Sequence, residues 1–186
     1  MLKQDRGRTQ LAESCNEILM SNKPIISVGD AALDYVYKIC EFPPAPTKLQ
    51  ALKHITSGGG MAANAAATIA KLGGTIALWS RVGDDDASTI IHQQLKRAGV
   101  DTTHVRAFAS ARSPTAAVIV DQGGQRLVIS EYDHALPLSA NWLPVSDVAG
   151  AAVVLSDLNW LESTLSLMPF MVSGTTRLLQ LPMKFR

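Results

Sequence analysis

The residues best suited to hold a ligand form a glycine turn that opens into an alanine-rich helix. Gly58, Gly59 and Gly60 precede a run of small helix formers from 61 to 72. Glycine lets a ligand approach the main chain closely, and the first turn of a helix presents unpaired N–H groups and a partial positive charge. Asn64, in that first turn, can both donate and accept hydrogen bonds. The segment therefore predicts a site for a polyhydroxylated or anionic small molecule.

Two other interpretations of the glycine turn remain open. It could be a tight connection where a helix packs on a sheet. It also fits the dinucleotide fingerprint G-x-G-x-x-A through Gly58, Gly60 and Ala63. That fingerprint should follow a buried apolar strand and precede an acidic residue that holds the ribose. The stretch 49–56 alternates instead, and the strand after the helix ends in Arg81, so a dinucleotide site is the less favoured of the two ligand hypotheses.

A carboxylate that could fix sugar hydroxyls lies upstream of the glycines. The apolar run Ile25 to Val28 ends in Gly29-Asp30, which is typical of a buried parallel strand whose carboxyl end faces a site. Asp34 follows this strand. Its carboxylate can accept hydrogen bonds from the adjacent hydroxyls of an aldose or ketose. The alternative is that Asp34 is a solvent-exposed cap at the end of a strand. In an open parallel sheet, ligands bind beyond the carboxyl ends of the strands. We expect these groups to converge there: Asp30, Asp34, the glycine turn, Gly83 to Asp85, and Asp157 to Asn159.

The elements that must position these residues alternate between strand and helix. Residues 75–80 predict a strand, Asp85 or Asp86 caps a helix that closes at Gly99, and 151–155 predict another buried strand. His92 is expected on the solvated face of that helix. The alternation predicts an α/β fold with a parallel sheet and helices on both faces. Asp84, Asp85 and Asp86 are better explained by helix capping than by a magnesium site, so no metal site is assigned.

A second group of strands alternates in polarity and predicts a small antiparallel β lid. The candidates are 35–39 and 49–56, separated by a proline cluster, and the hairpin of 115–120 with 126–130. The lid strands therefore lie near 35–57 and 113–132.

The composition indicates a globular protein. Hydrophobic residues make up 47% and charged residues 18%, and the net charge is +1 without a basic cluster, so we expect no nucleic-acid partner. Cys15 and Cys40 lack metal-ligand spacing, and a reducing, cytoplasmic location is the simplest inference. No run of about 18 apolar residues exists, so a membrane span is not expected.

The spacing from Gly59 and Gly60 through Asn64 to Gly73 and Gly83 resembles the first signature of the ribokinase-like (PfkB-type) carbohydrate kinases. The resemblance runs from residue 25 to residue 160, the N-terminal portion of the family. Within the family, residues 81–86 and the surroundings of the two tryptophans at 142 and 160 are most similar to the sulfofructose kinase branch. That branch has an arginine where this chain has asparagine 159.

The resemblance implies ATP-dependent phosphorylation of a sugar hydroxyl, with ATP and Mg2+ as cofactors of the full-length family. It places Asp34, Gly59, Gly60 and Asn64 at positions that hold the sugar, with Asn159 contacting it from the next strand. The family's lid often pairs two subunits, so a homodimer through the lid is the expected partner.

The chain departs from the family after Trp160. The family's catalytic base follows a later glycine-rich turn that this sequence lacks, so no catalytic residue is assigned. Residues 161–186 lack clear periodicity, and we expect a truncation or frameshift after residue 160. The predicted organisation is a polar extension at 1–23, a partial ribokinase-like substrate-binding domain at 24–160, and an atypical tail at 161–186. Two hypotheses follow: the sugar-binding half of a kinase, or a non-catalytic sugar-binding or dimerisation module.

Overall fold

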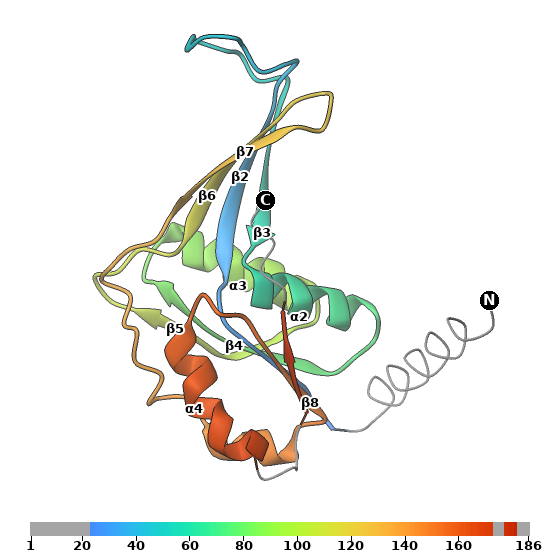
Figure 1. The fold of residues 1–186 in the computed structure, drawn as a ribbon, viewed down its shortest axis with the longest axis vertical. Helices are drawn as coiled ribbons and strands as arrows, with labels where there is room; N and C mark the ends of the chain where they lie inside the picture. Colours follow the sequence, from blue (N-terminus) through green and yellow to red (C-terminus); the bar gives the residue numbers. More distant parts are fainter. Residues whose placement is uncertain (1–22, 173–176, 182–186) are drawn as a thin grey trace, which may run out of the picture.

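The computed structural model describes residues 23–172 and 177–181. The expected N-terminal extension at 1–23 lies outside this part except for residue 23. Five parallel strands form the central sheet in the order β5-β4-β1-β8-β9 (Figure 1). Their bounds are β1 Ile25–Val28, β4 Ile76–Gly83, β5 Asp101–Phe108, β8 Val153–Ser156 and β9 Arg177–Gln180. The predicted strands at 25–28, 75–80 and 151–155 are confirmed with ends that differ by up to 3 residues, whereas β5 and β9 were not expected.

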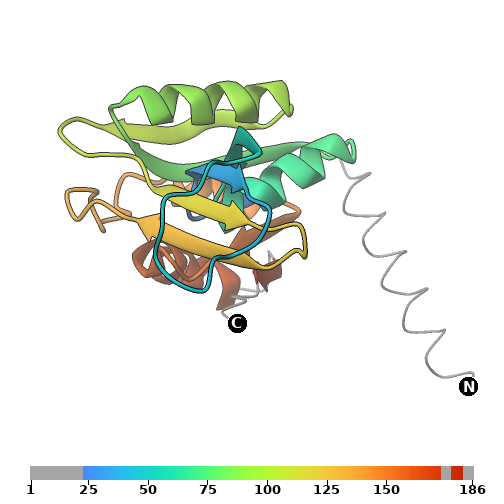
Figure 2. The same cartoon turned by 90° about the horizontal axis from the view of Figure 1, so that it is seen from above.

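Helices cover both faces of this sheet, as predicted. Helices α2 (Met61–Lys71) and α3 (Asp86–Arg97) pack on one face around a buried cluster that includes Leu78 and Ile91. The 3-10 helix η1 (Val145–Gly150) and α4 (Leu161–Val172) cover the other face around a second cluster that includes Trp160. Figure 2 shows α3 and α4 on opposite sides of the molecule. The alternation of β-strand side chains divides the core into these two clusters.

A second sheet has the order β3-β2-β6-β7 and projects from the first (Figure 1). Its strands are β2 Ala32–Lys38, β3 Lys53–Gly59, β6 Thr115–Val120 and β7 Arg126–Glu131. The prediction of an antiparallel lid is wrong for the central pair, because β2 and β6 run parallel. Between β2 and β6 the chain also forms strands of the first sheet, so no hairpin connects these two strands or sets their relative direction. The sheet is therefore mixed.

The segment after Trp160 is helical despite its lack of sequence periodicity. The buried side of α4 carries Ser163 and Thr164, while Leu161, Leu165 and Met168 on the same helix are about half exposed. Polar residues on the buried side and apolar residues on the exposed side remove the usual amphipathic pattern. Strand β9 then pairs with β8 in parallel.

The structure also corrects the expectation for His92. Its ring nitrogens lie 2.9 Å from the Ser88 carbonyl oxygen and 3.2 Å from the Val105 carbonyl oxygen, so the half-buried ring joins α3 to β5 instead of facing water. Within the described residues, no helix has the length and apolar character needed to cross a membrane.

Candidate functional site

A cavity of about 620 Å³ opens where the start of α2, the second sheet and the loop after β8 meet. Four of the five predicted ligand residues line it, namely Asp34, Gly60, Asn64 and Asn159. The second sheet contributes further polar groups that the sequence did not indicate, which are Thr115, Arg126 and Ser130, and Tyr132 follows directly after β7. Segments more than 120 residues apart in the chain thus meet around one space, as the strand-end argument predicts.

Gly59 does not line this cavity but supports Asp34 from behind. A Cβ at position 59 would stand 2.2 Å from the Oδ1 atom of Asp34, so the carboxylate rests directly on the glycine backbone. Gly59 instead borders a separate cavity of about 360 Å³ between α2, α3 and β3. Partial burial raises the pKa of Asp34 above its ordinary value. The glycine is therefore required for the position of the carboxylate.

Gly60 brings the start of α2 against the end of β1. Its φ is 87°, and a Cβ there would stand 2.3 Å from the Asp30 carbonyl oxygen. That carbonyl accepts a hydrogen bond from the Ala63 N–H at 3.2 Å, and Asp157 Oδ2 accepts one from the Ala62 N–H at 3.2 Å. Two first-turn N–H groups are thus occupied within the chain. Asp157 also compensates the positive end of the helix dipole, which makes the site less suited to an anion than the sequence alone suggested.

A buried ionic cluster lies beneath the cavity. Asp30 and Asp157 are 2% and 0% exposed, and Arg81 is 7% exposed. Burial and the neighbouring Asp157 raise the pKa of Asp30 to about 6, although Arg81, Asn159 and Tyr132 oppose that rise. Burial likewise raises the pKa of Asp157. Burial, followed by Asp30 and Asp157, raises the pKa of Tyr132 to about 12, so this phenol remains a hydrogen-bond donor at neutral pH.

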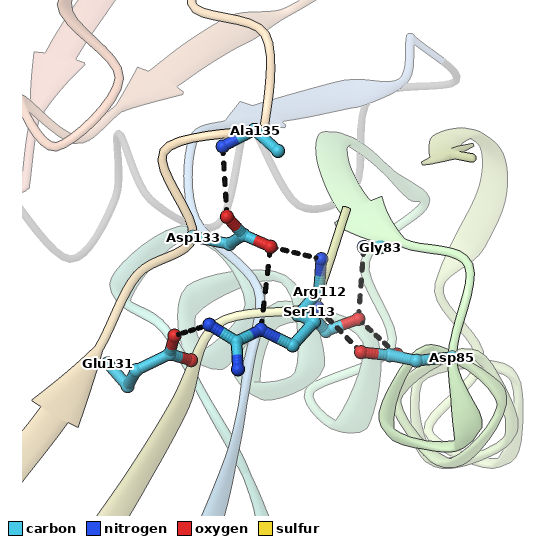
Figure 3. A network of polar contacts seen from close by, with 7 residues as sticks. All are labelled: Gly83, Asp85, Arg112, Ser113, Glu131, Asp133 and Ala135. Carbon is cyan, nitrogen blue, oxygen red and sulfur yellow. Dashed lines mark hydrogen bonds and ion pairs between the residues drawn. The ribbon is translucent and has the colours of Figure 1, made fainter. Parts of the chain in front are cut away.

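A polar network fixes the two neighbours of Tyr132 (Figure 3). Arg112 pairs with Glu131 at 2.6 Å and with Asp133 at 3.5 Å, and the Arg112 N–H donates to Asp133 Oδ2 at 2.9 Å. The other Asp133 oxygen accepts from the Ala135 N–H at 2.9 Å. The turn after β7 is held on both sides of the tyrosine, which positions its ring at the cavity.

The network continues to Asp85, which caps α3 as predicted. Its carboxylate accepts a hydrogen bond from the Ser88 N–H at 2.8 Å. It also accepts from the N–H and the hydroxyl of Ser113, each at 2.7 Å (Figure 3). Burial alone would raise the pKa of Asp85, but these hydrogen bonds lower it below its ordinary value. The Gly83 N–H donates to the same serine hydroxyl at 3.0 Å. Gly83 and Asp85 are therefore structural and do not line the 620 Å³ cavity.

Residues 22–159 match the profile of the pfkB family carbohydrate kinases. The chain is 37% identical over 142 residues to a fructokinase of Klebsiella pneumoniae, which covers 70% of this chain and 43% of that protein. It is 31% identical over 105 residues to an ATP-dependent ribose-1-phosphate kinase of Halopiger xanaduensis, covering 56% and 36% respectively.

The fold is similar to that of a ribokinase from Arabidopsis thaliana solved with ribose and ATP. The TM-score is 0.70 at 22% identity, and the match covers 86% of this chain and 53% of that one. At this identity the similarity concerns the fold alone. The chain spans about half or less of the length of each of these relatives.

Proposed function

The chain belongs to the pfkB family of carbohydrate kinases, and from that premise we propose that it forms the sugar-binding part of an ATP-dependent sugar kinase. The sugar occupies the 620 Å³ cavity. Asp34 accepts hydrogen bonds from adjacent hydroxyls, and the side-chain amides of Asn64 and Asn159 bind further oxygen atoms. The second sheet covers the sugar, which limits the access of water to a phosphoryl donor.

One observation carries this proposal: the Asp34 carboxylate rests on the Gly59 backbone and lines the same cavity as Asn64 and Asn159. These residues come from β2, α2 and the loop after β8. A carboxylate held between side-chain amides suits a ligand with several neighbouring hydroxyls.

The charges around the cavity favour a neutral sugar. Asp30 and Asp157 lie buried below it, and Asp157 already occupies the start of α2. A sulfonated sugar would meet Arg126 in the cavity wall, but it would also face these carboxyls and find Asn159 where the sulfofructose kinase branch has an arginine. We therefore propose a neutral aldose or ketose as substrate.

ATP and Mg2+ belong to the proposed reaction of the full-length enzyme. Among residues 23–172 and 177–181, no group of three His, Cys, Asp or Glu side chains could hold a metal ion. Phosphoryl transfer also needs a base for the sugar hydroxyl. No transfer step is therefore assigned to the described residues, whose part is to bind and orient the sugar.

The partner we propose is a second copy of this chain, docked through the second sheet. Strand β7 is an edge strand, and its Leu127 and Ile129 are 48% and 58% exposed. Exposed apolar edge strands favour pairing with another chain. Light scattering should give twice the monomer mass, and Ile129→Lys should reduce it to the monomer mass.

Calorimetric titration with D-ribose and D-fructose tests the sugar site. Asp34→Asn should weaken binding at least tenfold, because it replaces a charged acceptor of two hydrogen bonds. Asp84→Asn removes an exposed carboxylate outside the cavity and should leave the affinity unchanged. Equal affinities for all three proteins, or no sugar binding by the unmodified chain, would overturn the proposal. An ATP-consumption assay then distinguishes a kinase from the alternative, a non-catalytic sugar-binding or dimerisation module, which would bind sugar without turnover.

A further inference from the structure

The cavity of about 360 Å³ between α2, α3 and the end of β3 is separate from the proposed sugar cavity. Ala32 and Asn64 line both spaces, whereas Asp34 lines the sugar cavity alone. The ends of the two helices lie side by side here. A Cβ at Gly99, just after α3, would stand 3.8 Å from the Cβ of Ala70 in the last turn of α2.

The charged side chains that line this cavity are both cationic. They are Lys71 and Arg97, and no acidic residue is among those that line it. Both residues are exposed, so a ligand has access to their charged groups. Neither side chain forms an ion pair or a hydrogen bond with another residue that the structure describes. The cavity therefore carries two positive charges that no neighbouring carboxylate compensates.

Two side-chain amides add neutral hydrogen-bonding groups to the same space. Asn64 lines it from α2 and Gln94 from α3, and neither amide has a hydrogen-bond partner within the described part of the chain. Gln94 Oε1 would lie 3.1 Å from a Cβ at Gly58, so this amide reaches the glycine turn. Each amide provides N–H donors in addition to those of the two cations.

The remaining wall is mainly apolar. The helices contribute five such residues, which are Ala63, Ala67, Ile91, Leu95 and Ala98. Ligand sites typically combine an apolar wall with a few polar groups that fix orientation. The wall therefore suits a ligand that has an apolar body as well as a negative charge.

The helix dipole offers another explanation for the two cations. Lys71 and Arg97 lie in the last turns of α2 and α3, where a cation compensates the partial negative charge of the helix end. Lys96 occupies the same turn of α3 but does not line the cavity. Dipole compensation predicts that Lys96 and Arg97 behave alike, whereas a ligand site predicts that they differ.

We propose that the 360 Å³ cavity binds a small organic phosphate, with the phosphate beside Lys71 and Arg97 and the apolar part against the alanines of α2. A doubly charged phosphate matches two cations, and the planar guanidinium of arginine suits phosphate oxygens. This proposal does not depend on the sugar site, because none of these contacts requires a bound sugar.

Calorimetric titration with phenyl phosphate tests the site, at a pH above about 7 where the phosphate is doubly charged. Phenyl phosphate should bind at least tenfold more tightly than inorganic phosphate, which has the charge without the apolar body. Lys71→Ala and Arg97→Ala should each weaken this binding at least threefold. Lys96→Ala is the matched control and should leave the affinity unchanged. Ala67→Leu fills the cavity without changing the charge and should remove the advantage of phenyl phosphate over inorganic phosphate.

Four outcomes would overturn the proposal. The first is no saturable binding of phenyl phosphate, and the second is binding no tighter than that of inorganic phosphate. The third is an equal loss in Lys96→Ala and Arg97→Ala, which would indicate general attraction to basic side chains. The fourth is a loss confined to Arg126→Ala, which would place the anion in the sugar cavity. Circular dichroism checks the fold of each variant; if Ala67→Leu does not fold, the comparison of Arg97→Ala with Lys96→Ala decides.

Discussion

The carboxylate of Asp34 and the backbone of Gly59 are in such close contact that no side chain fits between them. A Cβ at position 59 would lie 2.2 Å from Asp34 Oδ1 and 2.6 Å from its carboxyl carbon. The aspartate side chain is short, so its carboxyl group would have to move to make room for a Cβ at position 59. The proposed sugar acceptor and the glycine turn therefore form one unit.

Gly59→Ala should weaken sugar binding by displacing Asp34, while the chain remains folded. We expect calorimetry to show at least a tenfold loss of affinity. Gly58→Ala is the matched control, because its Cβ would lie 3.1 Å from only the end of the flexible Gln94 side chain. Equal affinities for these two variants would contradict the assignment of Asp34 as sugar acceptor.

The stability of the chain should depend on pH through Asp30. Its folded pKa of about 6 exceeds the ordinary 3.8, so the folded state favours the protonated carboxyl. This contribution is fully present below pH 3.8 and is lost as the pH rises through 6. Between pH 4 and pH 8 the free energy of unfolding should fall, relative to Asp30→Asn, by up to about 3 kcal/mol. Urea unfolding measures both proteins; parallel pH profiles would show that Asp30 titrates normally.

Gly29→Ala should destabilise the fold strongly. Gly29 has a φ of 144°, and a Cβ there would stand 2.3 Å from the buried Asp157 carboxylate. We expect a loss of at least about 2 kcal/mol in the free energy of unfolding, because backbone strain and a buried clash act together. Gly150→Ala meets no atom within 4 Å and should stay within about 0.5 kcal/mol of the unmodified chain. A small effect at Gly29 would mean that Asp157 can move.

Arg112→Ala should affect ligand binding more than stability. The arginine side chain is 69% exposed, and exposed ion pairs contribute about 0–1 kcal/mol each. Its pairs with Glu131 and Asp133 nevertheless hold the turn that carries Tyr132. We expect a melting temperature within a few degrees of the original and a sugar affinity reduced severalfold. The sugar affinity of Arg126→Ala, which removes an arginine from the cavity wall itself, serves as the comparison. An unchanged affinity in Arg112→Ala would show that the Arg112 network does not influence the site.

The parts of the site that local chemistry dictates could be predicted from sequence. Gly60 and Asn64 belong to a turn and helix start whose residue types directly specify the backbone. The cap of α3 by Asp85 could be predicted because an acidic residue directly before a stretch with helical apolar periodicity is a strong signal of a helix start. Asp34 could be predicted as a ligand residue because it lies shortly after a buried strand.

Other parts depend on long-range contacts that no local pattern encodes. Tyr132 lies at a hairpin end, and its orientation depends on Arg112, which precedes β6. Arg81 was seen only as the residue after a strand, because its neighbours Asp30 and Asp157 come from distant segments. The parallel pairing of β2 with β6 could not be inferred either, since alternating polarity identifies a strand without its direction.

The contact of Gly60 with the Asp30 carbonyl has a consequence for motion. Only residues 29–31 separate β1 from β2, and Gly60 alone separates β3 from α2, so two of the four crossings of the chain between the two sheets lie within one small region; the other two are at 109–114 and 132–144. Any swing of the second sheet over a bound molecule must bend the backbone at these crossings. Gly60 consequently belongs to both the hinge and the wall of the cavity, and a change that stiffens the chain at this residue will also alter what the pocket accepts.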